Sequence, residues 1–196
     1  MELIGPYLVA CGLLAIAGVA KAARPDDTAR ALVQLTAPID GRGPSRRRTP
    51  GFGTVRSLVR IGAAAEALLG VVALVVPRTG TAAAVCASYL VFAGFVALAI
   101  VRGGTLATCG CFGRPDTPPT AVHVAVNLVL AGSAAAVAAA APATGTVLRV
   151  LAHQPWHGVP LVLVAALGTW LATLVLVHLS ALEAVRRQVG LRAGHP

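Results

Sequence analysis

TAAAVCASYLVFAGFVALAIV, residues 81–101, is the stretch of sequence that decides the fold of this chain. It contains no charged residue and is long enough to cross the hydrocarbon of a bilayer, which takes about 20 residues of helix. Four further stretches have the same or nearly the same character: Leu3–Ala20, Leu58–Val76, Ala121–Ala141 and Val159–Leu179. The sequence therefore predicts an all-α polytopic protein, a bundle of four transmembrane helices with a fifth, C-terminal span.

The overall composition agrees with a membrane protein. Hydrophobic residues make up 57% of the chain and charged residues only 12%, against about 45–50% and about 25% in soluble domains. The first span follows Met1-Glu2 instead of a basic segment, and positive charges come after it, at Lys21 and Arg24. This layout is typical of a retained span and not of a cleaved signal peptide.

The net charge of +9 could indicate binding to nucleic acid or contact with anionic lipid. Aromatic residues are only 4% of the chain, too few for a platform on which bases stack. Basic residues that flank hydrophobic spans instead face anionic lipid. We therefore expect the lipid bilayer as a partner and no nucleic acid.

The basic residues also predict an orientation. When the spans are crossed alternately, all of the 16 Lys and Arg residues except Arg78 and Arg149 fall on one side. The positive-inside rule then places the N-terminus outside and the C-terminus inside the plasma or inner membrane. Six of these charges lie in one connection, 22–54, for which we expect a short amphipathic helix from Asp27-Thr28 to Leu35 and a flexible linker over 40–50.

The connection after the third span carries the most informative motif, Thr108-Cys109-Gly110-Cys111-Phe112-Gly113. Two thiols one residue apart can close a small, strained disulfide ring, and glycine removes the side chain that would obstruct it. Strained, exposed disulfides are more labile and more oxidising than structural ones. The motif favours redox chemistry over two alternatives, half of a metal site or two unpaired surface thiols.

Polar residues in and beside the spans complete a candidate site. Glu66 is the only acidic residue deep in a predicted span, and an ionisable group there is by default a functional hypothesis. His123 and Asn127 are four residues apart and so share a helical face. By parity of crossings, Lys21, His123 and the cysteine pair belong to one face of the membrane. Cys11 and Cys86, within spans, are expected to be small core residues.

These residues resemble those of the MauE/DoxX-like redox-associated membrane proteins. The resemblance rests on Ala17-Gly18-Val19-Ala20-Lys21, Ala65-Glu66, Cys109-Gly110-Cys111-Phe112-Gly113 and the pair His123 and Asn127, and it covers about residues 3–141. It implies a DoxX-like four-helix membrane core over 1–141. The fifth span and the basic tail that we expect over 142–196 lie outside the resemblance. It also implies thiol–disulfide chemistry or electron transfer that supports the maturation of partner proteins, as in methylamine dehydrogenase assembly.

The sequence thus predicts a membrane thiol–disulfide oxidoreductase or electron relay that acts on a thiol or disulfide partner protein. A quinone is a plausible electron partner by chemical analogy only, since no quinone motif is readable. Two alternatives stay open: a non-catalytic membrane anchor or assembly subunit, and a metal-handling protein that uses cysteine and histidine. The residues expected to carry the redox chemistry are Cys109, Cys111, His123, Lys21, Glu66 and Asn127.

Overall fold

The computed structural model describes residues 4–36, 51–102, 120–140 and 155–174, and every element in those ranges is helical. The elements are α1 (Ile4–Ala23), α2 (Pro25–Thr36), α3 (Phe52–Val75), α4 (Thr79–Val101), α5 (Ala121–Ala140), the 3-10 turn η2 (Pro155–Gly158) and a last helix over Val159–Leu174. The predicted all-α fold is confirmed.

Four helices, α1, α3, α4 and α5, are long and apolar enough to cross a membrane. They correspond to the first four predicted spans. The last helix is shorter over its described residues, and the end of the predicted fifth span, to Leu179, lies outside them. A fifth crossing therefore stays a prediction, as does the linker at 40–50, which also lies outside the described residues.

Three helices start earlier than the sequence pattern predicts, among them α4, which begins at Thr79 and not at Thr81. α3 begins at Phe52 and not at Leu58, because Arg56 is a good helix former and extends the helix beyond its apolar part. α2 begins at Pro25 and not at Asp27-Thr28. Proline suits the first turn, where its missing N–H has no partner to lose, and acidic residues there face the positive end of the helix dipole.

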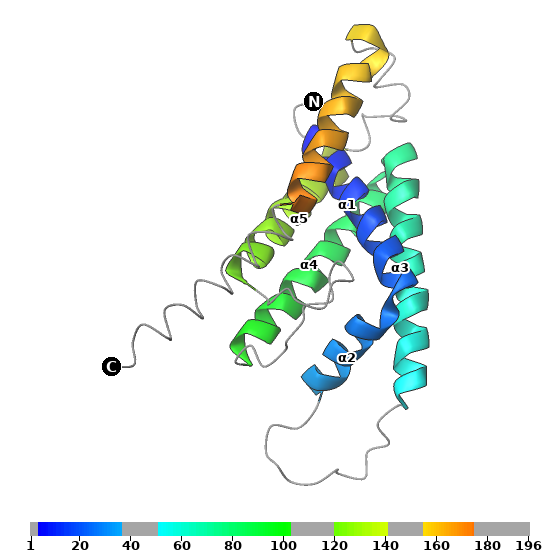
Figure 1. Ribbon diagram of the computed structural model, residues 1–196. Coiled ribbons are helices and arrows are strands. Elements are labelled where there is room, and N and C mark those ends of the chain that lie inside the picture. The colour runs from blue at the N-terminus through cyan, green and yellow to red at the C-terminus, as the bar shows by residue number, and fades with distance from the viewer. Residues whose placement is uncertain (1–3, 37–50, 103–119, 141–154, 175–196) are drawn as a thin grey trace, which may run out of the picture.

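The bundle consists of two closely packed helix pairs (Figure 1). α1 packs most extensively against α3, and α4 against α5, while α1 also contacts α5 and joins the pairs. α3 and α4 follow each other in the chain yet contact less. The buried core draws side chains from all four long helices, including Tyr7, Leu14, Ala73, Val85 and Ala134.

Glycines set the distance between α1 and α3. A Cβ added to Gly18 would lie 2.5 Å from the backbone nitrogen of Ala67. A Cβ added to Gly70 would lie 2.7 Å from the nitrogen of Ala15 and from the carbonyl oxygen of Cys11. Each helix thus presents a glycine to the backbone of the other. Such close approach is the usual basis of helix packing in lipid, where the hydrophobic effect does not bring helices together.

Two tyrosines add hydrogen bonds between helices. The Tyr89 hydroxyl of α4 donates to the carbonyl oxygen of Ala10 in α1 at 2.6 Å. The Tyr7 hydroxyl of α1 donates to the carbonyl oxygen of Ala73 in α3 at 3.4 Å. Both tyrosines are buried, and these bonds satisfy hydroxyl groups that would otherwise be costly to remove from water.

The last helix lies against α1. Leu8 of α1 and Ala165 share a small buried cluster, and a Cβ on Gly12 would come within 3.0 Å of the Thr169 hydroxyl oxygen. The remaining face of this helix is apolar and exposed, with Leu163 at 64% of its full exposure. That surface is compatible with contact to lipid.

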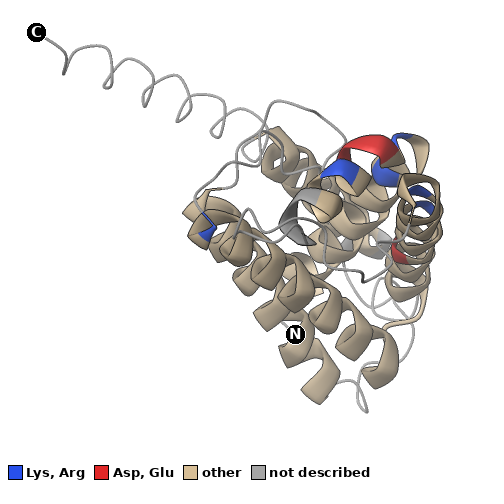
Figure 2. Cartoon of the chain, turned by 90° about the horizontal axis from the view of Figure 1, so that it is seen from below, with Lys and Arg blue, Asp and Glu red and all other residues tan. Residues whose placement is uncertain are grey.

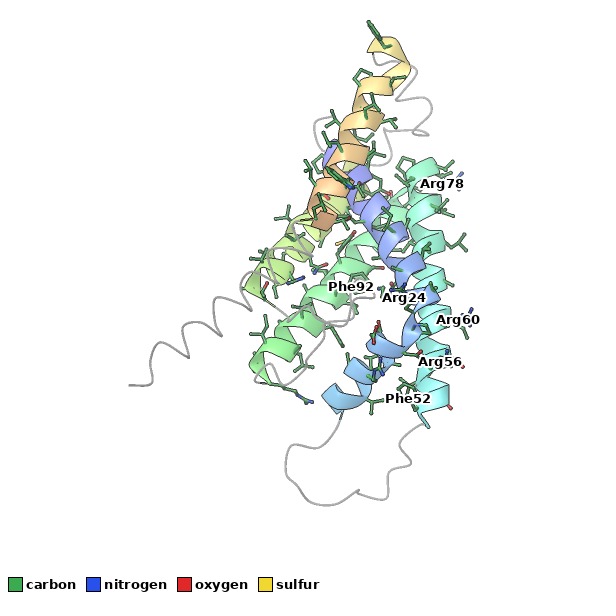
Figure 3. All side chains as sticks on the ribbon, in the orientation of Figure 1. Arg24, Phe52, Arg56, Arg60, Arg78 and Phe92 are labelled. Atoms are coloured by element: carbon green, nitrogen blue, oxygen red, sulfur yellow. The ribbon has the colours of Figure 1, made fainter. Side chains whose placement is uncertain are left out.

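Charged residues are distributed unevenly along the bundle. Seen from the end where α1 meets α2, most of the coloured residues gather around that junction (Figure 2). Arg24, Arg56 and Arg60 lie toward this end, whereas Arg78 lies at the opposite end, between α3 and α4 (Figure 3). The described part of the chain thus has the charge asymmetry on which the predicted orientation depends.

Candidate functional site

A buried ion pair joins α1 and α3. The Lys21 ammonium contacts the Glu66 carboxylate, and the two side chains are only 8% and 24% exposed. Gly18 lies three residues before Lys21, so both face α3 on the same side of α1. The close glycine packing therefore brings Lys21 within reach of a carboxylate that lies near the middle of α3.

An aromatic ring from α4 closes the other side of this ion pair. The Lys21 Nζ atom lies 4.2 Å from the centroid of the Phe92 ring, a cation–π contact. Phe92 in turn meets Tyr89 edge to face, with 6.0 Å between ring centroids. Figure 3 shows Phe92 on the side of α4 toward α1. The lysine head group is thus held by three helices.

The first turns of α5 supply a second polar group. The Thr120 hydroxyl and the His123 Nδ1 atom are hydrogen-bonded at 2.9 Å, and the backbone N–H of His123 donates to the Thr120 carbonyl oxygen at 3.1 Å. The Asn127 amide donates to the His123 carbonyl oxygen at 2.7 Å. His123 is only 4% exposed. Hydrogen bonds among Thr120, His123 and Asn127 thus stabilise the start of α5.

A small cavity connects this group to the lysine. Its volume is about 50 Å³, and its lining includes Lys21 from α1, Tyr89 and Phe92 from α4, and His123 and Asn127 from α5. A cavity needs only about 10–15 Å³ of such space, together with polar partners, to hold a water molecule. This cavity has both and can accommodate water between the lysine and the imidazole.

A larger cavity lies on the other side of Lys21. It measures about 240 Å³ and is lined by Lys21, Glu66, Phe92 and Phe95, together with residues of α2. Lys21 and Phe92 line both cavities. They therefore form the partition between the imidazole side and the carboxylate side of the bundle.

The structure brings together four of the six residues that the sequence selected. Lys21 contacts Glu66. Lys21 also lines one cavity with His123 and Asn127, and Glu66 is not part of that lining. The other two, Cys109 and Cys111, lie outside the described residues.

Sequence reasoning missed the aromatic residues of this site. Tyr89, Phe92 and Phe95 recur every third residue and so share a face of α4, in a chain that has only four phenylalanines. This spacing is the sequence signal that could have identified them.

The remaining described cysteines are part of the packing. Cys11 is fully buried in the core and Cys86 packs against it, and neither forms a disulfide. Within the described ranges no three His, Cys, Asp or Glu side chains are close enough to hold a metal ion. The metal alternative depends on Cys109 and Cys111, and is not tested by these residues.

Comparison with known proteins places the chain in a family. The family described as "Methylamine utilisation protein MauE" matches residues 2–141, which include all four long helices and every candidate site residue. The chain matches no curated protein and no solved structure. The helix over Val159–Leu174 lies beyond the matched region. Because the match covers most of the chain, this multi-pass membrane protein belongs to the MauE family of methylamine utilisation proteins.

Proposed function

We propose that this MauE-family protein is a membrane thiol–disulfide oxidoreductase or electron relay whose redox pair is Cys109 and Cys111, and that it supports the redox maturation of a partner protein. The observation that carries the proposal is the Lys21–Glu66 ion pair buried in the bundle. A buried ion pair is seldom more stable than well-packed apolar residues. Its presence in a membrane span therefore favours a functional role.

Chain connectivity links this polar cluster to the thiols. Cys109 and Cys111 belong to the segment that joins the end of α4 to Thr120 and His123 at the start of α5. The cavity that contains His123 also contains Lys21. The motif therefore precedes, in the chain, the end of α5 that carries the buried imidazole.

The proposed reaction is disulfide exchange. A partner thiolate attacks the Cys109–Cys111 disulfide and forms a mixed disulfide, which the second partner thiol then resolves. The partner leaves with a disulfide, and Cys109 and Cys111 remain as two thiols that hold two electrons and two protons. The reverse sequence reduces a partner disulfide.

The polar residues have distinct roles in this scheme. His123 accepts the proton of the attacking or leaving thiol, and Lys21, which lines the same cavity as His123, favours the thiolate form. Glu66 balances the lysine charge and takes part in proton transfer. Asn127 holds the backbone of the first turn of α5 through its bond to the His123 carbonyl oxygen.

Thiol counting tests the proposal. In a Cys11→Ala/Cys86→Ala background only Cys109 and Cys111 remain, and a maleimide carrying a polymer tag should shift the protein on a gel only after reduction. A matched variant with Cys109→Ser and Cys111→Ser should not shift at all. Two reactive thiols in every preparation, with or without oxidant, would contradict the redox role.

Further measurements separate the alternatives. If the Cys109→Ser/Cys111→Ser variant supports partner maturation as well as the parent, the protein is an assembly or anchoring subunit. Stoichiometric metal in the purified parent, lost in the same variant, would indicate metal handling.

A further inference from the structure

The larger cavity beside the ion pair is built from four helices and opens toward lipid. It includes Lys21 of α1, Leu32 of α2 and Glu66 of α3. From α4 it includes Val91, which is 68% exposed. α3 contacts α4 less extensively than α4 contacts α5. The cavity therefore has a lateral mouth between α3 and α4, on the apolar surface of the bundle.

The polar chemistry of this cavity suits a neutral ligand. Lys21 contributes an ammonium group and Glu66 a carboxylate, which balance each other's charge. An ammonium has three N–H donors and a carboxylate about four acceptor positions, so the pair has capacity beyond its own contact. A neutral ring that bears oxygen atoms could accept from Lys21 and donate to Glu66. A phosphate or carboxylate head group would instead be repelled by the carboxylate of Glu66.

The walls and the volume restrict the ligand further. Phe92 and Phe95 both line the cavity and offer aromatic surfaces to a planar ring. The volume of about 240 Å³ is below the range of about 300–1,000 Å³ that encloses a drug-sized molecule. It is enough for a single substituted ring but not for a long tail, which would have to lie outside, in the bilayer.

We propose that this cavity binds the ring of a lipid-soluble quinone, whose tail leaves between α3 and α4 into the membrane. Its carbonyl oxygens accept hydrogen bonds from Lys21, and after reduction the hydroxyl groups donate to Glu66. Binding depends only on the described cavity, whereas the electron-accepting role rests on the proposed function. In that role one quinone takes two electrons and two protons from the two thiols, which become a disulfide, and leaves as a quinol.

A pair of glycine variants tests the cavity. Gly62 of α3 lines it and Gly94 of α4 does not, yet a Cβ added to either glycine meets no atom within 4 Å. Gly62→Leu therefore fills the cavity without a backbone clash, and Gly94→Leu is the matched control. The protein in lipid nanodiscs is photolabelled with an azido-quinone, and a decyl-tailed quinone competes for the site.

The expected result is labelling of peptides from α3 or α4 in the parent and in Gly94→Leu. Gly62→Leu should weaken competition about tenfold or more, equivalent to about 1.4 kcal/mol. Absence of competable labelling in the parent would overturn the inference. So would equal competition in both variants, or competition by anionic phosphatidylglycerol instead of the quinone.

The same assay separates this inference from the proposed function. It is repeated in the Cys109→Ser/Cys111→Ser variant, which has no thiol pair to react. Labelling that persists there supports the cavity even if thiol counting contradicts the redox role. A reversible disulfide in a protein that shows no competable labelling supports the redox role and refutes the quinone site.

Discussion

Glu66→Leu should destabilise the protein strongly, because it leaves the Lys21 ammonium buried without its carboxylate. Removing one partner of a buried ion pair costs about 3–5 kcal/mol. The cation–π contact of Lys21 with Phe92, at 4.2 Å, is present in the parent and in the variant, so it does not change this difference. We therefore expect a loss of about 3–5 kcal/mol in the free energy of unfolding.

A second substitution should reverse most of this loss. Lys21→Met in the Glu66→Leu background removes the orphaned charge and keeps a side chain of similar length. The double variant should come within about 1–2 kcal/mol of the parent, because buried ion pairs are replaceable by packed apolar residues. Glu66→Gln keeps a hydrogen-bond acceptor for Lys21, so it should fold while losing any function that needs the carboxylate.

Unfolding in mixed micelles, followed by far-UV circular dichroism, measures these differences. Arg56→Met is the matched control, because the Arg56–Asp26 pair, at 2.8 Å, is about half exposed on both sides. It should cost less than about 1 kcal/mol. The reasoning is refuted if Glu66→Leu lowers the free energy of unfolding no more than Arg56→Met does. It is also refuted if the double variant loses as much as Glu66→Leu and Lys21→Met, each made alone, lose together.

The remaining predictions concern packing and topology. Gly18→Ala should destabilise the protein by about 1–3 kcal/mol or more, because the new Cβ meets the backbone of α3 at 2.5 Å. Gly80→Ala, where a Cβ meets nothing within 4 Å, should be neutral or stabilising in the same melt. Tyr89→Phe should cost about 1 kcal/mol through its lost bond to α1, and unchanged thermal stability in detergent would contradict that bond. Cys109 and Cys111, once reduced, should react with an impermeant maleimide only after cells are permeabilised. Strong labelling of intact cells would reverse the predicted orientation.

The cavity of about 240 Å³ gives the ion pair a proposed role in ligand binding, in addition to its effect on stability. Lys21 is shared between a cavity that contains His123 and one that contains Glu66. A cation at such a partition lines both the cavity of the proposed proton acceptor and the cavity proposed for the quinone ring. Loss of Lys21 should therefore impair both thiol reactivity and quinone competition, whereas Gly62→Leu should impair only the second.

The sequence by itself determined the membrane class and the four long helices, because a run of about 20 apolar residues without charge can bury its backbone in lipid only as a helix. It also selected the polar residues of the site, since each is costly in a span and therefore conspicuous. Parity of crossings, which needs no coordinates, placed Lys21 and His123 at the same end of the bundle.

Tertiary structure alone decided which of these residues meet. Glu66 is equally compatible with Lys21 or Asn127 in the sequence, and only the glycine packing of α1 against α3 pairs it with Lys21. The aromatic partition and the two cavities depend on the rotation of α4 about its axis. α4 is apolar on every side, so its hydrophobic pattern could not predict that rotation, and only the spacing of Tyr89, Phe92 and Phe95 marks the inner face. Van der Waals contact with α1 and α5 determines it instead, because lipid is as apolar as the core and does not favour one face of the helix over another.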